Sequence, residues 1–116
     1  MAGTEIIVAA AMLLAGSEWG FATGGGISVQ FGDGQVSGSG GCNRFVGSYT
    51  QEGERLTLSR LAVTQMACTD DQVMIKEQQF LHMLGAVQSA EATHLKLVLK
   101  DAAGKELAVL VRRDWD

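Results

Sequence analysis

The feature that most constrains this fold is a pair of cysteines set in two unusual segments. Cys42 lies in the segment from Gly38 to Tyr49, which also holds several glycines, an amide, an arginine and two aromatic residues. Cys68 ends a second segment that begins at Thr64. Because the chain has no other cysteine, a disulfide has only one pairing, and it requires an oxidising compartment. The alternative is two reduced cysteines buried as small apolar side chains in a cytoplasmic protein.

The composition is that of one small globular domain with many tight turns. The chain has 116 residues, of which 47% are hydrophobic and 19% charged. Fifteen glycines and no proline favour short strands joined by turns, and they argue against a proline-rich linker. The net charge is −4, and no basic cluster is larger than the pair Arg112 and Arg113. We therefore expect no nucleic-acid partner, because binding phosphates requires a basic patch.

We treat residues 1–13 as an apolar N-terminal segment and residues 14–116 as the domain. The apolar run from Ile6 to Leu14 is too short to cross a membrane as a helix. It is either a first structural element or a vestigial export signal, although Glu5 and the lack of a preceding basic residue weaken the second interpretation. The same run could add a strand across a homodimer. Residues 13–17 resemble a bacterial lipid-attachment motif with Ser17 in place of the cysteine, so we expect no lipid anchor.

Alternating apolar residues predict several antiparallel strands. Ile27, Val29 and Phe31 form the first, and Asp33-Gly34 predicts a two-residue hairpin turn with positive φ at both positions. Further strands are expected from 36, over 45–50 and over 56–59, with a short strand or extended segment within 61–66. After the helix, the expected apolar faces are formed by Leu95, Leu97 and Leu99 in one strand and by Leu107, Val109 and Val111 in the next.

One α-helix is predicted over about residues 70–87. Thr69 and Gln72 have the spacing of a capping box, in which both side chains accept hydrogen bonds from unpaired backbone N–H groups at the helix start. The expected apolar stripe consists of Val73, Phe80, Leu81, Leu84 and Val87, with Met74 and Met83 beside it. Residues 76–79, including Glu77, are assigned mainly to the solvent face. The prediction is an α+β fold, in which an antiparallel, strongly curled sheet or partly open barrel of about seven or eight strands packs on one helix.

Several motifs in this order resemble one known family. They are Gly16-Ser17-Glu18-Trp19, Gly38-Ser39-Gly40-Gly41-Cys42-Asn43-Arg44-Phe45 with Gly47 and Tyr49, Leu56-Thr57-Leu58, Thr64-Gln65-Met66-Ala67-Cys68, Glu77-Gln78-Gln79-Phe80-Leu81, and Leu110-Val111-Arg112-Arg113-Asp114-Trp115. On these residues the chain is similar to the META domain, or HslJ-like, family from about Leu14 onward.

The resemblance implies a small domain of the bacterial envelope without established enzymatic activity. The family is linked to the heat-shock response and to antibiotic tolerance, to novobiocin in particular, and its fold is similar to small lipid-binding barrels that act as pilots for secretion proteins. This chain departs from the family pattern in three places. Thr69 stands where proline is frequent, the lipoprotein cysteine is missing, and the segment between Trp19 and Ile27 is short and glycine-rich.

Few residues suggest chemistry. Asn43 and Arg44 have structural interpretations, a turn for Asn43 and a carboxylate pair or stacking on Trp19 or Trp115 for Arg44. The alternative is a binding site at the sheet rim formed by these four residues. We expect no catalytic residues and no cofactor. His82 and His94 lack ligands at metal spacing, so we expect no metal site either. The glycine run 38–41 lacks the context of a phosphate loop, and close backbone packing or a bulge is favoured.

The sequence thus leaves two functional hypotheses. The first is a non-enzymatic envelope module, located in the periplasm, that binds a protein or a hydrophobic small molecule during stress. The second is a structural or inhibitor-like domain that docks a partner protein without a small-molecule ligand, and a cytoplasmic location remains the alternative. A ligand-sized apolar cavity inside the sheet, lined by residues such as Phe80, Met66, Met74 and Met83, favours the first. A solid core favours the second.

Overall fold

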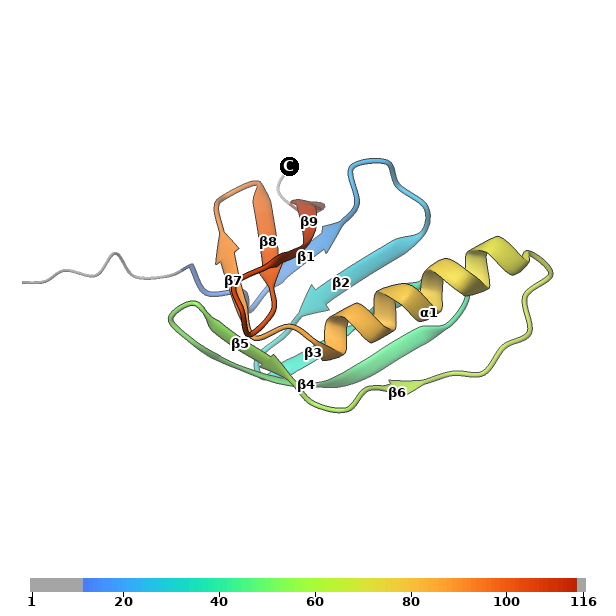
Figure 1. Ribbon diagram of the computed structural model, residues 1–116, viewed down its shortest axis with the longest axis horizontal. Helices are drawn as coiled ribbons and strands as arrows, with labels where there is room; N and C mark the ends of the chain where they lie inside the picture. Colours follow the sequence, from blue (N-terminus) through green and yellow to red (C-terminus); the bar gives the residue numbers. More distant parts are fainter. Residues whose placement is uncertain (1–11, 115–116) are drawn as a thin grey trace, which may run out of the picture.

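The protein is a closed antiparallel β-barrel with one helix packed against it. The computed structural model describes residues 12–114 (Figure 1). Its elements are β1 (Ser17–Gly20), β2 (Ile27–Phe31), β3 (Gln35–Gly40), β4 (Arg44–Glu52), β5 (Arg55–Leu58), β6 (Ala62–Val63), α1 (Asp71–Gly85), β7 (Ser89–Ala92), β8 (Lys96–Lys100) and β9 (Glu106–Arg112). The predicted N-terminal segment and the homodimer based on it concern residues that lie almost entirely outside the described ones.

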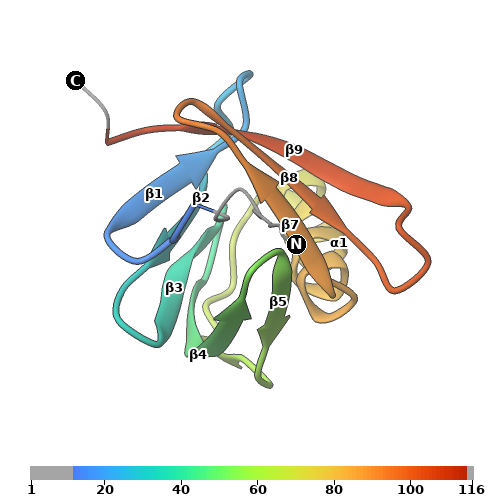
Figure 2. The same cartoon turned by 90° about the vertical axis from the view of Figure 1, so that its left-hand side faces the viewer.

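The strands close into a ring of eight. Their spatial order is β3-β2-β1-β9-β8-β7-β5-β4, and pairing between β3 and β4 closes it, while the short β6 pairs with Phe45 and Val46 near the start of β4. All pairs are antiparallel. Figure 2 shows the strands arranged around the barrel, with α1 beyond them. The predicted α+β class with a curled sheet and one helix is confirmed, and the barrel is closed rather than partly open.

Side chains from the strands, from the segment before β1 and from α1 form one hydrophobic core. The largest that are fully buried are Trp19, Leu14, Leu56, Leu84, Leu97, Leu99 and Leu110. Edge-to-face contacts join Phe31 to Tyr49 and Phe21 to Phe80, so aromatic side chains connect the barrel with α1. Burial of this apolar surface is the main stabilising contribution to such a fold.

Two details of the last hairpin differ from the prediction. Leu95 precedes β8 and is 47% exposed, whereas Leu97 and Leu99 are buried as expected. In β9 the predicted face of Leu107, Val109 and Val111 is correct only for Leu107, which packs against the core, and the fully buried residue of the strand is Leu110. A register shift lies between Leu99 and Lys100, and both faces of β9 are apolar, so alternation alone could not identify its inner face.

The ends of the helix and one hairpin turn also differ from the prediction. The N-cap is Asp70 rather than Thr69, because the Asp70 carboxylate accepts hydrogen bonds from the backbone N–H groups of Gln72 and Val73. The helix ends at Gly85, two residues earlier than predicted. In the β2–β3 turn only Gly34 has positive φ, at 80°, so the predicted turn type with two such residues is wrong.

Candidate functional site

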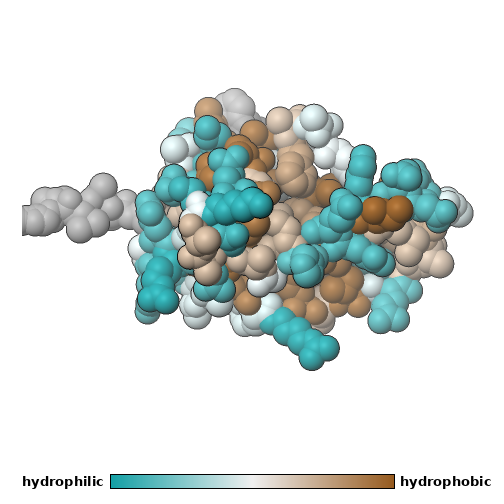
Figure 3. Space-filling model, viewed as in Figure 1, coloured by the Kyte–Doolittle hydropathy of each residue, from teal (hydrophilic) through white to brown (hydrophobic). Residues whose placement is uncertain are grey.

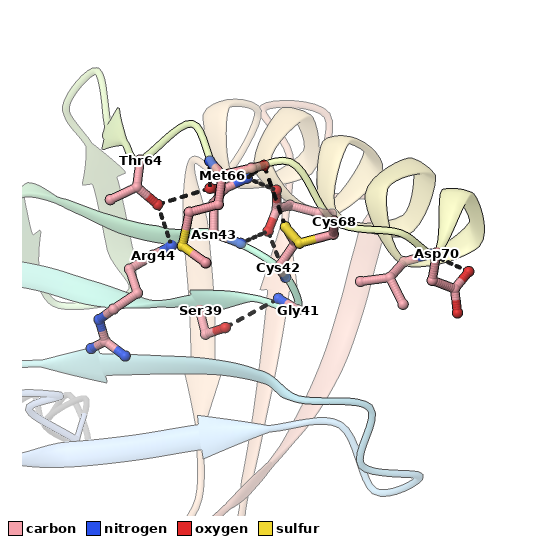
Figure 4. Close-up of a disulfide and its surroundings, with 11 residues drawn as sticks. Ser39, Gly41, Cys42, Asn43, Arg44, Thr64, Met66, Cys68 and Asp70 are labelled. Atoms are coloured by element: carbon pink, nitrogen blue, oxygen red, sulfur yellow. Dashed lines mark hydrogen bonds between the residues drawn. A yellow bond between two sulfur atoms is a disulfide. The ribbon is translucent and has the colours of Figure 1, made fainter.

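A disulfide joins the barrel to the segment that leads into α1. Cys42 lies in the turn between β3 and β4, and Cys68 lies in the extended segment before the helix, with the two Cα atoms 6.2 Å apart (Figure 4). The predicted pairing is therefore present in the structure. In the chain-entropy description, closing a loop of this length stabilises the folded state by about 3.5 kcal/mol.

Beneath the disulfide, a buried carboxylate holds α1 against the same turn. Glu77 is only 4% exposed, and its Oε2 accepts hydrogen bonds from the backbone N–H groups of Cys42 at 2.9 Å and Asn43 at 2.5 Å. Its Oε1 accepts a third from the Asn43 side-chain amide at 2.8 Å. The Asn43 amide oxygen in turn accepts from the Thr64 hydroxyl and the Met66 backbone N–H. The network thus ties α1, the β3–β4 turn and the segment after β6 together.

This arrangement keeps Glu77 ionised. Burial raises the pKa of the Glu77 carboxyl, but the hydrogen bonds from the Asn43 side chain and from the Asn43 and Cys42 backbones lower it by more. The net pKa lies below its ordinary value. The predicted position of Glu77 on the solvent face is wrong, because the residue is only 4% exposed. Helical spacing carried the signal, since Val73, Glu77, Phe80 and Leu84 follow one another at intervals of four, three and four residues.

The glycines of the 38–41 run allow this close packing. A Cβ on Gly40 would lie 2.5 Å from Cγ of Glu77, and one on Gly38 would collide with the Ser28 carbonyl oxygen. Gly41 also has a φ of 115°, which side-chain-bearing residues rarely adopt. The predicted role of the run in close backbone packing agrees with this geometry.

Of the four predicted binding residues, the structure describes Trp19, Asn43 and Arg44, and their surroundings differ. Trp19 is fully buried, and its indole N–H donates to the Ser17 hydroxyl. Asn43 is buried in the Glu77 network. Arg44 is exposed on β4, and its side chain points away from the disulfide (Figure 4). Trp115 lies outside the described residues. The cation that lies over the Trp19 ring is that of Arg112, 5.5 Å from the ring centroid, rather than that of Arg44.

An apolar pocket, which the sequence did not indicate, lies between α1 and the barrel. Its volume is about 460 Å³, within the usual range for small-molecule sites. Helix α1 contributes Val73, Lys76, Gln79, Phe80 and Met83, and the β1–β2 loop and the start of β2 contribute Phe21, Thr23, Gly24, Gly25 and Ile27. The remaining lining residues are Gly40, Gly41, Leu107 and Ala108. On the face of the molecule drawn in Figure 3, apolar side chains are exposed between hydrophilic ones.

The pocket therefore differs from the expected cavity inside the sheet. Phe80 and Met83 line it as the sequence analysis expected for a cavity, but Met66 is 58% exposed on the outer segment. The glycine-rich loop forms one wall, with Gly24, Gly25 and Gly26 all at positive φ. Within residues 12–114, no group of three or more histidine, cysteine, aspartate or glutamate side chains is placed to hold a metal ion. No helix of the described chain has the length and apolar character needed to span a bilayer.

The fold and this site define a class: small, disulfide-linked antiparallel barrels with one helix packed beside an apolar pocket. Residues 14–114 match the META domain, and the chain belongs to this family. The comparison with curated proteins finds no match.

Three solved structures share the fold. An NMR structure of a protein from Burkholderia xenovorans is 20% identical with a TM-score of 0.71, and the match covers 98% of this chain and 97% of that one. A second NMR structure is 24% identical with a TM-score of 0.65, covering 85% and 90%. A DUF4847 family protein from Bacteroides vulgatus is 15% identical with a TM-score of 0.58, covering 78% and 61%. At these identities the similarity concerns the fold alone.

Proposed function

We propose that this domain is a non-enzymatic module of the bacterial envelope that binds a hydrophobic small molecule in the pocket between α1 and the β1–β2 loop. The observation that carries the proposal is the pocket itself, whose walls include Phe21, Ile27, Phe80 and Met83. Apolar walls with a few polar groups at the rim are typical of small-molecule sites. The Cys42–Cys68 disulfide supports a periplasmic location, because disulfides persist in oxidising compartments.

The biological role we propose follows from membership of the META domain family. Such a module would support envelope integrity during heat shock and other stress, and it would contribute to tolerance of novobiocin-type antibiotics. The test measures the novobiocin sensitivity of a strain that lacks the protein. The same strain is also measured after complementation by a variant in which a larger side chain fills the pocket. Equal sensitivity of the strain with and without the protein would contradict it.

Titration with Nile red, a neutral dye that fluoresces in apolar surroundings, tests the pocket. Gln79 lines the pocket and Gln78, its exposed neighbour on α1, does not. Gln79→Phe should therefore narrow the pocket and weaken dye binding, while Gln78→Phe adds the same side chain to the same helix as a control. Unchanged dye binding by Gln79→Phe, or no dye binding by the unmodified protein, would refute the pocket as a ligand site.

A second candidate function, docking of a partner protein, is favoured by a separate surface. Val46 is 50% exposed on β4 and Val63 is 36% exposed on β6, and both line an open depression beside Arg44. Exposed apolar side chains grouped beside a cation are frequent in protein interfaces. A Val46→Glu variant that keeps Nile red binding but loses the activity of the protein in the novobiocin assay would favour docking over ligand binding.

A further inference from the structure

The charge distribution around the pocket indicates what kind of molecule fits it. Of the side chains that line it, only that of Lys76 carries a charge. The other polar side chains at the pocket are those of Thr23 and Gln79, and the remaining lining residues are apolar or glycine. The pocket thus combines an extended apolar wall with a single cation.

Lys76 is not neutralised by an ion pair within the described residues. The two ion pairs found there join Lys100 to Glu91 and Arg112 to Asp114. The neighbouring carboxylate of Glu77 is directed into the protein, where Cys42 and Asn43 donate to both of its oxygens. Since the whole chain has a net charge of −4, this cation does not belong to a generally basic surface. It remains available to an anion from solution.

We infer that the pocket binds a free single-chain amphiphile with an anionic head group. This inference rests on the proposed function. The apolar tail lies against Phe21, Ile27, Phe80 and Met83, and the head group pairs with the Lys76 ammonium. The volume of about 460 Å³ equals that of about fifteen groups of water size, at about 30 Å³ each. It therefore suits a chain of medium length rather than a two-chain lipid.

Three probes built on a ten-carbon chain, with different head groups, test the inference: decanoate, decanol and decyltrimethylammonium. Their affinities are measured by displacement of Nile red at low ionic strength. We expect decanoate to bind about two- to five-fold more tightly than decanol, the range that an exposed ion pair contributes. The cationic probe should bind most weakly, and added salt should remove the preference for decanoate.

Charge variants separate the head-group interaction from binding of the tail. Lys76→Gln should remove the preference for decanoate without changing the affinity for decanol, and Lys76→Glu should favour the cationic probe. Lys96→Gln removes the same charge from an exposed position outside the pocket and serves as the control. Equal affinities of the three probes for the unmodified protein, or a preference for decanoate that survives Lys76→Gln, would overturn the inference.

The remaining outcomes separate this inference from the proposed function. If Nile red itself does not bind, the proposed function fails, and the inference fails with it. If Nile red binds but the decyl probes do not displace it, only the inference fails. Sedimentation with anionic phospholipid vesicles distinguishes a free amphiphile from a membrane surface as the source of the anion. We expect the protein to remain in the supernatant, and sedimentation with the vesicles would overturn the assignment to a free ligand.

Discussion

Replacing Glu77 by leucine tests whether the buried carboxylate holds the helix on the barrel. The change removes three hydrogen bonds, those from the backbone N–H groups of Cys42 and Asn43 and that from the Asn43 side-chain amide, which keeps only a long contact to the Met66 carbonyl. A hydrogen bond to a charged group contributes about 1.5–3 kcal/mol. Three such bonds at the low end, offset by about 2 kcal/mol from burying the leucine side chain, predict a loss of about 2.5 kcal/mol. Glu77→Leu should therefore lower the free energy of unfolding by about this amount.

Urea denaturation of the oxidised protein at pH 7 measures this loss. The matched control is Gln78→Leu, which places the same residue at the next, exposed position of α1. That variant should change the unfolding free energy by no more than about 0.5 kcal/mol. A loss below about 1 kcal/mol for Glu77→Leu would refute the reasoning, because the three hydrogen bonds would then contribute little beyond the cost of burying the charge.

Three further predictions concern the same region. The lowered pKa of Glu77 makes the folded state more stable above the pKa of an unfolded glutamate, about 4.3, so stability falls as the pH drops toward the folded-state pKa. Glu77→Gln should flatten this dependence in denaturation series between pH 7 and pH 3, and an unchanged slope would contradict the assignment. Mass spectrometry without reductant should detect no free thiol at Cys42 or Cys68, and replacing both by serine should lower the unfolding free energy by about 3.5 kcal/mol; free thiols in natively purified protein would remove this prediction. Gly40→Ala should cost about 1–3 kcal/mol by overpacking against Glu77, whereas Gly85→Ala, with open space at its Cβ, should raise the thermal midpoint; equal effects of the two would refute the packing argument.

Local patterns were sufficient to predict most of the elements. Alternation identified the strand of Ile27, Val29 and Phe31, and the helix was found within a few residues of its bounds. Closure of the ring was harder to predict from the sequence, because it depends on strand pairs far apart in the chain, such as Trp19 with Arg112. Hydrophobic periodicity describes the face that a strand buries and contains no information about which strand lies beside it.

The candidate site was harder to predict than the fold. Glu77 was assigned to solvent because of its charge, although its helical spacing placed it between Val73 and Phe80 on the buried stripe. Burying a carboxylate is favourable only where hydrogen-bond donors compensate for the lost water. For Glu77 these donors come from a turn 34 residues earlier in the chain. The pocket was missed for a similar reason, since its walls come from α1, the β1–β2 loop and β9, which meet only in the folded protein.

The two walls of the pocket differ in how firmly they are fixed to the barrel, and this difference determines which wall can vary in sequence. Helix α1 is fixed near its start by a covalent bond through Cys68 and along its length by Glu77. The opposite wall includes the β1–β2 loop, where Gly24 and Gly25, both at positive φ, contribute backbone rather than large side chains. A longer or shorter stretch around these glycines would therefore change the size of the proposed ligand site, while Phe21 at the start of the loop kept its contact with Phe80. Divergence of ligand preference among domains of this architecture should be concentrated in the length of that one loop.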